Sequence, residues 1–89
     1  MENKELLKIF REQIDWIDRE ILYLLFRRFT LVDEIWKVKK EIWMNPLQKD
    51  RWNEVLNDKI ETWKEYNLDK GFIEDIWNRI HKEALKIEK

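Results

Sequence analysis

The feature that most constrains this chain is an apolar pattern that continues through its first half. Apolar side chains recur in steps of three and four residues, at Leu7, Phe10, Ile14, Ile17, Ile21 and Leu24, then at Leu31, Ile35, Val38 and Ile42. This spacing places them on one face of a helix that we predict from about Lys4 to about Trp43. At a rise of ~1.5 Å per residue the helix is roughly 60 Å long, about twice the diameter of a small domain. Its own chain cannot cover such a stripe, so we expect a partner.

The rest of the chain also favours helices, because one Gly and one Pro leave few places for turns. Asn45 and Pro46 are expected to end the first helix, since the residue before proline disfavours the helical region. A second helix is predicted from about Lys49 to Tyr66 and a third from about Lys70 to the end, with Asp69 as a candidate cap. The fold class is therefore all-α, with three helices.

Composition excludes several classes of protein. The 18 basic and 19 acidic residues give a net charge of -1, which argues against a general nucleic-acid surface. There is no cysteine and a single histidine, His81, so we expect no disulfide and no metal site. No apolar run approaches the length of a bilayer span, and the amino terminus is charged rather than signal-like, so we expect a cytoplasmic protein with no membrane partner.

One position in the first helix breaks the pattern. Arg28 occupies a slot that the spacing reserves for an apolar residue, and a charge there is costly unless something pairs with it. Lys39 lies eleven residues further on, which returns a helix to nearly the same face. The spacing therefore predicts two cations facing one anion site.

Arg11 is the third candidate cation, and it points roughly 80 to 100° away from the other two. It lies about 25 Å or more along the axis from Arg28, so it can join them only from another copy of the chain. Antiparallel pairing about a two-fold axis near residues 20 to 25 would bring it there. The alternative is that Arg11 and Lys39 are ordinary surface charges and that Arg28 pairs with an acid of a neighbouring helix.

The run LKIFREQIDWIDREILYLLFRRFTLVDEIWKVK resembles the first-helix signature of the all-helical chorismate mutases. That signature is an LR-x-x-ID-x-ID-x-x-L-x-x-LL-x-x-R pattern with an I-x-x-x-K ending. The resemblance continues through Pro46, the DRWNEVL stretch, the NLD turn and the FIEDIWNRIHKEA segment, so it covers nearly the whole chain.

The resemblance implies one domain over residues 1–89, working as an intertwined antiparallel helical homodimer. It implies an isomerase of the shikimate pathway of aromatic amino acid biosynthesis. The reaction is the Claisen rearrangement of chorismate to prephenate, which needs no metal or cofactor. Arg11 from the partner and Arg28 would bind the substrate's two carboxylates. Lys39 would contact a carboxylate and the ether oxygen, and Arg51 would assist at the carboxylate end.

Four positions qualify that expectation. Trp52 stands where the family usually has the Glu that accepts the substrate hydroxyl, and by itself it would be read as a core residue. Gln48 replaces a common Asp among the substrate-binding positions, and Ala84 replaces a small polar residue. Glu88 aligns with the last catalytic position, commonly Gln or Glu, although a residue so near the end of a helix could instead be frayed and solvated. His81 by itself would be read as a packing residue.

Two other functions remain open. An isochorismate pyruvate lyase resembles this fold and also lacks the acid after the Arg of the second helix, as here at Trp52. A helical dimerisation or regulatory module, or a designed or degenerate member of the fold, would explain the lost polar contacts and the Trp-rich apolar faces.

Overall fold

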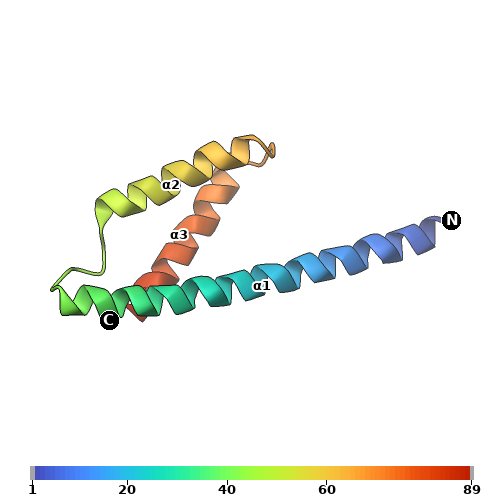
Figure 1. Ribbon diagram of the computed structural model, residues 1–89. Helices are drawn as coiled ribbons and strands as arrows, with labels where there is room; N and C mark the ends of the chain where they lie inside the picture. Colours follow the sequence, from blue (N-terminus) through green and yellow to red (C-terminus); the bar gives the residue numbers. More distant parts are fainter. Residues whose placement is uncertain (1, 89) are drawn as a thin grey trace. The chain divides into compact units, whose positions relative to one another are not determined.

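A computed structural model describes residues 2–88 of the chain, and the described residues form three helices and no strand. Helix α1 spans Asn3–Glu41, α2 spans Lys49–Lys64 and α3 spans Lys70–Ile87 (Figure 1). The chain divides within α1 into two compact units, one ending at Leu31 and the other beginning at Val32. The all-α prediction is confirmed, and each unit is described by itself below.

The first unit is helical from Asn3 to its end, and its apolar stripe lies open. No residue of α1 is buried, and the residues that the pattern placed on one face are about half exposed in this unit, from 47% at Leu7 to 58% at Leu31. A soluble chain rarely leaves a long apolar stripe uncovered. The structure thus agrees with the expectation that this chain does not cover the stripe itself.

Helix α1 ends two residues before the predicted end at Trp43. The Trp43 amide donates to the Lys40 carbonyl, and the Met44 amide donates to the Lys39 carbonyl at 2.8 Å. Trp43 has a φ of 59°, in the left-handed region. This is the Schellman pattern that closes many helices, usually with Gly at the left-handed position. The helix therefore stops by its own cap before Asn45 and Pro46 are reached.

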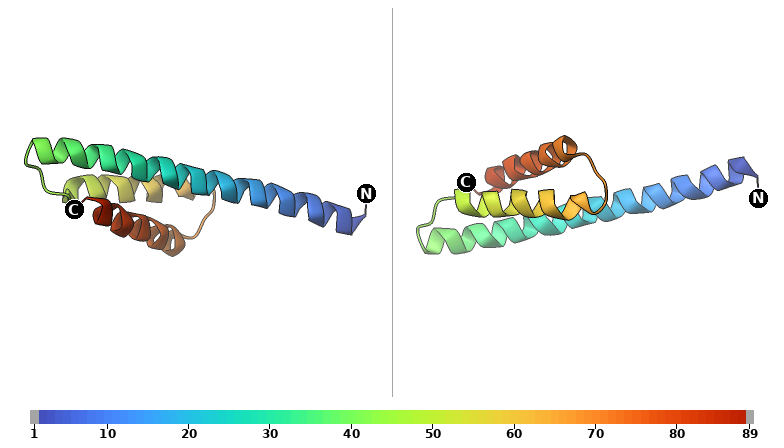
Figure 2. Two further views of the ribbon diagram at one scale, coloured as in Figure 1. Left: turned by 90° about the horizontal axis from the view of Figure 1, so that it is seen from below. Right: turned by 90° about the horizontal axis from the view of Figure 1, so that it is seen from above.

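In the second unit, α2 and α3 pack against each other as a helical hairpin (Figure 2). Helix α2 ends at Lys64 instead of the predicted Tyr66, and the turn after it uses a left-handed Asn67 with a φ of 56°. Helix α3 begins as predicted, because the Asp69 carboxylate accepts a hydrogen bond of 2.9 Å from the Phe72 amide.

The core of the second unit is thin. Its buried apolar side chains are Trp63 on α2 and Ile73 and Ala84 on α3, and among the described residues Glu88 is the buried polar one. None of the three helices has an apolar stretch long enough to span a membrane, over the residues described.

Candidate active site

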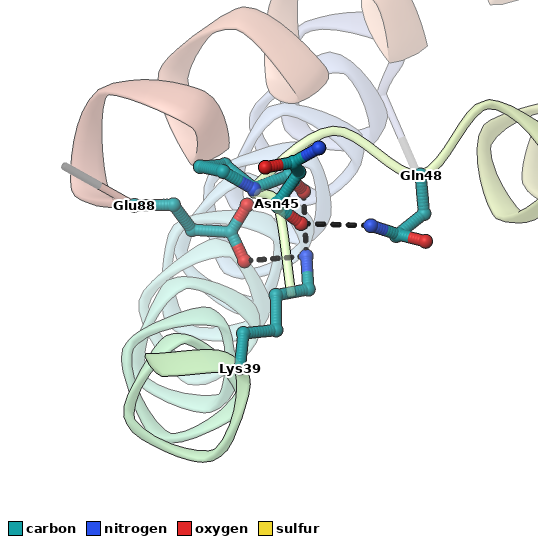
Figure 3. Close-up of polar contacts among 5 residues, drawn as sticks. Lys39, Asn45, Gln48 and Glu88 are labelled. Carbon is teal, nitrogen blue, oxygen red and sulfur yellow. Dashed lines mark hydrogen bonds and ion pairs between the residues drawn. The ribbon is translucent and has the colours of Figure 1, made fainter. Parts of the chain in front are cut away.

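Lys39 is the predicted cation with the best-defined surroundings. It lies near the end of α1, and its ammonium donates to the Glu88 carboxylate at 2.9 Å and to the Pro46 carbonyl at 2.6 Å (Figure 3). The Lys39 side chain is 14% exposed and that of Glu88 is 6% exposed. An ion pair so well shielded from water interacts more strongly than a surface pair, and removing one partner leaves a costly unpaired charge.

Glu88 follows α3 directly. Its backbone amide donates to the Ala84 carbonyl at 3.2 Å, so the last turn of the helix holds the residue in place. The alternative of a frayed and solvated Glu88 is therefore wrong for this structure. Sequence position alone could not decide this, because the burial of Glu88 depends on Lys39, which lies 49 residues away in the chain.

The loop between α1 and α2 forms part of the same surroundings. The side-chain amide of Gln48 donates to the Asn45 carbonyl at 2.8 Å (Figure 3). Pro46, which lies between these two residues, supplies the carbonyl that accepts from Lys39. Gln48 is also the N-cap residue of α2, but its side chain makes no capping hydrogen bond there. The Gln48 side chain instead donates its hydrogen bond within the loop that positions Lys39.

Sequence reasoning treated Trp52 and His81 separately, and the structure brings them together. Their rings stack with centroids 4.1 Å apart and planes inclined by 13°. Trp52 comes from α2 and His81 from α3, and both are half-buried. His81, Ala84 and Glu88 share one face of α3, since they follow at steps of three and four residues. No local pattern could have predicted a contact between residues 29 positions apart on different helices.

The three predicted arginines are described in their own units. Arg11 is exposed on α1 in the first unit, and Arg28 is half-buried near the end of that unit, where it interacts with a neighbouring group. Arg51 is exposed on α2 and pairs with Glu54 at 3.4 Å. Within the second unit, the structure therefore brings Lys39, Glu88 and the Gln48 loop together, whereas Arg51 pairs with Glu54 instead.

Other charged pairs lie on the surface. Hydrogen bonding to Glu34 raises the pKa of Lys37, hydrogen bonding from Lys59 lowers the pKa of Asp58, and hydrogen bonding from Lys86 lowers the pKa of Glu83. These exposed pairs are screened by water and contribute little to stability. Within residues 2–88, no group of His, Asp and Glu side chains has the arrangement of a metal site.

The site therefore offers a shielded cation, a carboxyl group beside it and an aromatic stack on the same helix face. Comparison with known families gives a match to the model of chorismate mutase type II over residues 10–89. Comparisons with curated proteins and with solved structures gave no match. Because the family model covers nearly the whole chain, including every residue of the Lys39–Glu88 site, the chain belongs to the chorismate mutase type II family.

Proposed function

We propose that this protein is a chorismate mutase that rearranges chorismate to prephenate, and the observation that carries the proposal is the shielded Lys39–Glu88 pair. The family match supports chorismate as the substrate. In the rearrangement the ether C–O bond breaks while a new C–C bond forms within one molecule. The protein has to hold a flexible dianion in a folded shape and stabilise the negative charge that develops on the ether oxygen.

Lys39 suits that task because its ammonium is already fixed. The Pro46 carbonyl and the Glu88 carboxylate hold it at 2.6 and 2.9 Å, so little reorganisation is needed when charge develops nearby. An ammonium has three hydrogens, so a third is available for a substrate oxygen. Glu88 would serve as a hydrogen-bond donor to the ether oxygen only in its protonated form, because a carboxylate can only accept.

The remaining cations would come from the assembly. We propose a homodimer in which the exposed stripe of the first unit is covered by a second copy, with Arg11 contributed across the interface. Arg28 and the partner's Arg11 would bind the two carboxylates of the substrate. Arg51, now paired with Glu54, would be recruited at the carboxylate end, and Gln48 would act beside it.

A second candidate function is an isochorismate pyruvate lyase. The observation that favours it is the stack of Trp52 on His81, which puts an aromatic ring where the hydroxyl-binding acid of a mutase is expected. The lyase would use the same cations on an isomeric dianion. A helical module without catalysis is the remaining alternative.

The deciding experiment is a direct assay with product identification. Purified protein is supplied separately with chorismate and with isochorismate, and the products are separated and identified. We expect prephenate from chorismate. Salicylate and pyruvate from isochorismate, with no prephenate, would replace the proposal by the lyase.

Absence of turnover on both compounds calls for a binding measurement. Titration calorimetry with a bicyclic mimic of the rearrangement's transition state then separates a weak enzyme from a bare scaffold. Binding that Lys39→Ala abolishes would keep the site assignment, whereas absence of binding would leave the non-catalytic module.

A further inference from the structure

The stack of Trp52 and His81 is a feature of the second unit that the proposed chemistry does not use. Both side chains are half-buried, one from α2 and one from α3, and the small inclination between their rings makes this a face-to-face contact. The buried apolar side chains of the core are others, namely Trp63, Ile73 and Ala84.

The Trp52–His81 stack and the Lys39–Glu88 ion pair are connected through one face of α3. His81 and Glu88 lie on the same helix face, seven residues apart, which is about 10 Å along the axis. Ala84 lies between them, buried and with the smallest side chain on that face. The face therefore has a cation at one end, held by Glu88, and a flat aromatic pair at the other end.

A ligand that matches this face has an anionic group at one end and a flat unsaturated ring at the other. The ring would be recognised by shape and by contact with aromatic edges. Trp52 brings no carboxylate to this end, and an indole offers a single N–H donor and no acceptor. A ring substituent such as a hydroxyl is therefore not selected by a charged acceptor from Trp52.

We propose that the Trp52–His81 stack determines the specificity of the site, so that it takes cyclohexadienyl enolpyruvyl ethers with little regard to the ring hydroxyl. This inference rests on the proposed function. Its substrate class includes the ether that carries the hydroxyl and the ether in which hydrogen replaces it. The reacting atoms are the same in both, since the C–O bond that breaks and the C–C bond that forms do not involve the hydroxyl.

The ratio of kcat/KM for the two ethers distinguishes a site that hydrogen-bonds the ring hydroxyl from a site with an apolar wall there. A site built to hydrogen-bond a hydroxyl rejects the compound that lacks it by about 10⁴-fold or more, whereas an apolar wall discriminates by about 10²-fold or less. We therefore expect kcat/KM for chorismate and for its deoxy analogue to differ by less than about 100-fold in the unaltered protein. A ratio above that value would overturn the inference.

Two variants locate the effect. His81→Phe keeps a flat ring against Trp52 and removes the imidazole nitrogens, so the ratio should stay within about threefold of the unaltered protein, a span typical of context effects on a single interaction. A larger fall in the preference for chorismate would mean that the imidazole binds the hydroxyl, and the inference would be wrong. Trp77→Phe, on the same face of α3 but outside the Trp52–His81 stack, is the control for a change of aromatic side chain, and it should leave the ratio unchanged.

The assay also separates this inference from the proposed function. If neither ether is consumed, the proposed function fails, and calorimetric affinities of the same two ethers decide the inference by the same 100-fold threshold, which again follows from the two kinds of recognition. If neither ether binds, both are wrong.

Discussion

The two units of this chain reach stability by different routes. The second unit has a buried, if thin, core of its own in Trp63, Ile73 and Ala84, whereas α1 has no buried residue at all. The apolar residues of α1 nevertheless recur as regularly as those of a packed helix face, although they are about half exposed. Helices in water owe most of their stability to packing of an apolar face. This regular, exposed pattern is the reason why we propose that a second copy covers it.

The largest effect is expected from a charge placed in the stripe of the first unit. Ile17→Asp should prevent assembly and unfold the chain, because an unpaired carboxylate would be buried against the second copy. Circular dichroism and sedimentation measure the two consequences. Tyr23→Asp is the matched control, since Tyr23 is similarly exposed, 59% against 53%, but lies about 120° around the helix from Ile17. Equal tolerance of both substitutions would contradict a covered stripe.

The next largest effect is expected on catalysis, from a substitution of Lys39 in the second unit. Lys39→Ala should lower kcat by about 10²- to 10³-fold, because a cation at the breaking bond gains interaction as charge develops there. The substitution also leaves the buried Glu88 carboxylate without its cation. The loss of kcat is therefore best measured in a Glu88→Gln background, where no unpaired buried charge remains. An effect confined to KM would make Lys39 a binding residue and contradict its proposed role.

A moderate effect is expected from Glu88→Gln alone. The Glu88 carboxylate pairs with Lys39, and a carboxylate can only accept a hydrogen bond, so it would repel the negative charge that develops on the ether oxygen. Glutamine of similar shape can donate a hydrogen bond, so the variant should have a higher kcat at neutral pH, by up to the about 10²- to 10³-fold that one positioned donor contributes. Steady-state rates of both proteins on chorismate measure this. If the two rates coincide, Glu88 does not reach the substrate.

The smallest effect concerns the stability of the second unit. Asp69→Ala removes the cap that accepts from the Phe72 amide and should cost about 1 kcal/mol in the free energy of unfolding. Asp50→Ala, which removes an acid from the first turn of α2, is the control for the loss of charge near a helix start. Urea denaturation compares them. A cost at Asp50 equal to that at Asp69 would mean that the helix dipole, and not the cap, explains the effect.

The sequence predicted some of these features well, for local reasons. The three helices and the Asp69 cap follow from periodicity and from the geometry of a helix start, which a few neighbouring residues determine. The end of α1 was missed because Gly or Asn is the usual signal of a left-handed cap, and here Trp43 adopts it. The position of Asn45 and Pro46 suggested a stop that the helix does not need.

Contacts between distant residues were harder to predict. Periodicity identified Lys39 as one of two cations on a face, and the family resemblance identified Glu88, but neither could predict that they form an ion pair. Their approach depends on how the loop through Pro46 returns the chain. The Trp52–His81 stack was missed for the same reason, since each residue alone resembles ordinary packing. The functional roles of all six site residues stay predictions: Arg11, Arg28, Lys39, Gln48, Arg51 and Glu88.

We propose that the two units act together only in a homodimer, in which Arg11 of one copy completes the site of the other. The most direct test mixes an Arg11→Ala chain with an Arg28→Ala chain and measures chorismate consumption after subunit exchange, followed by mass spectrometry. Each variant alone should be nearly inactive. Heterodimers should regain activity, because one of their two sites then contains both arginines. Absence of recovery despite demonstrated exchange would contradict a site shared between copies.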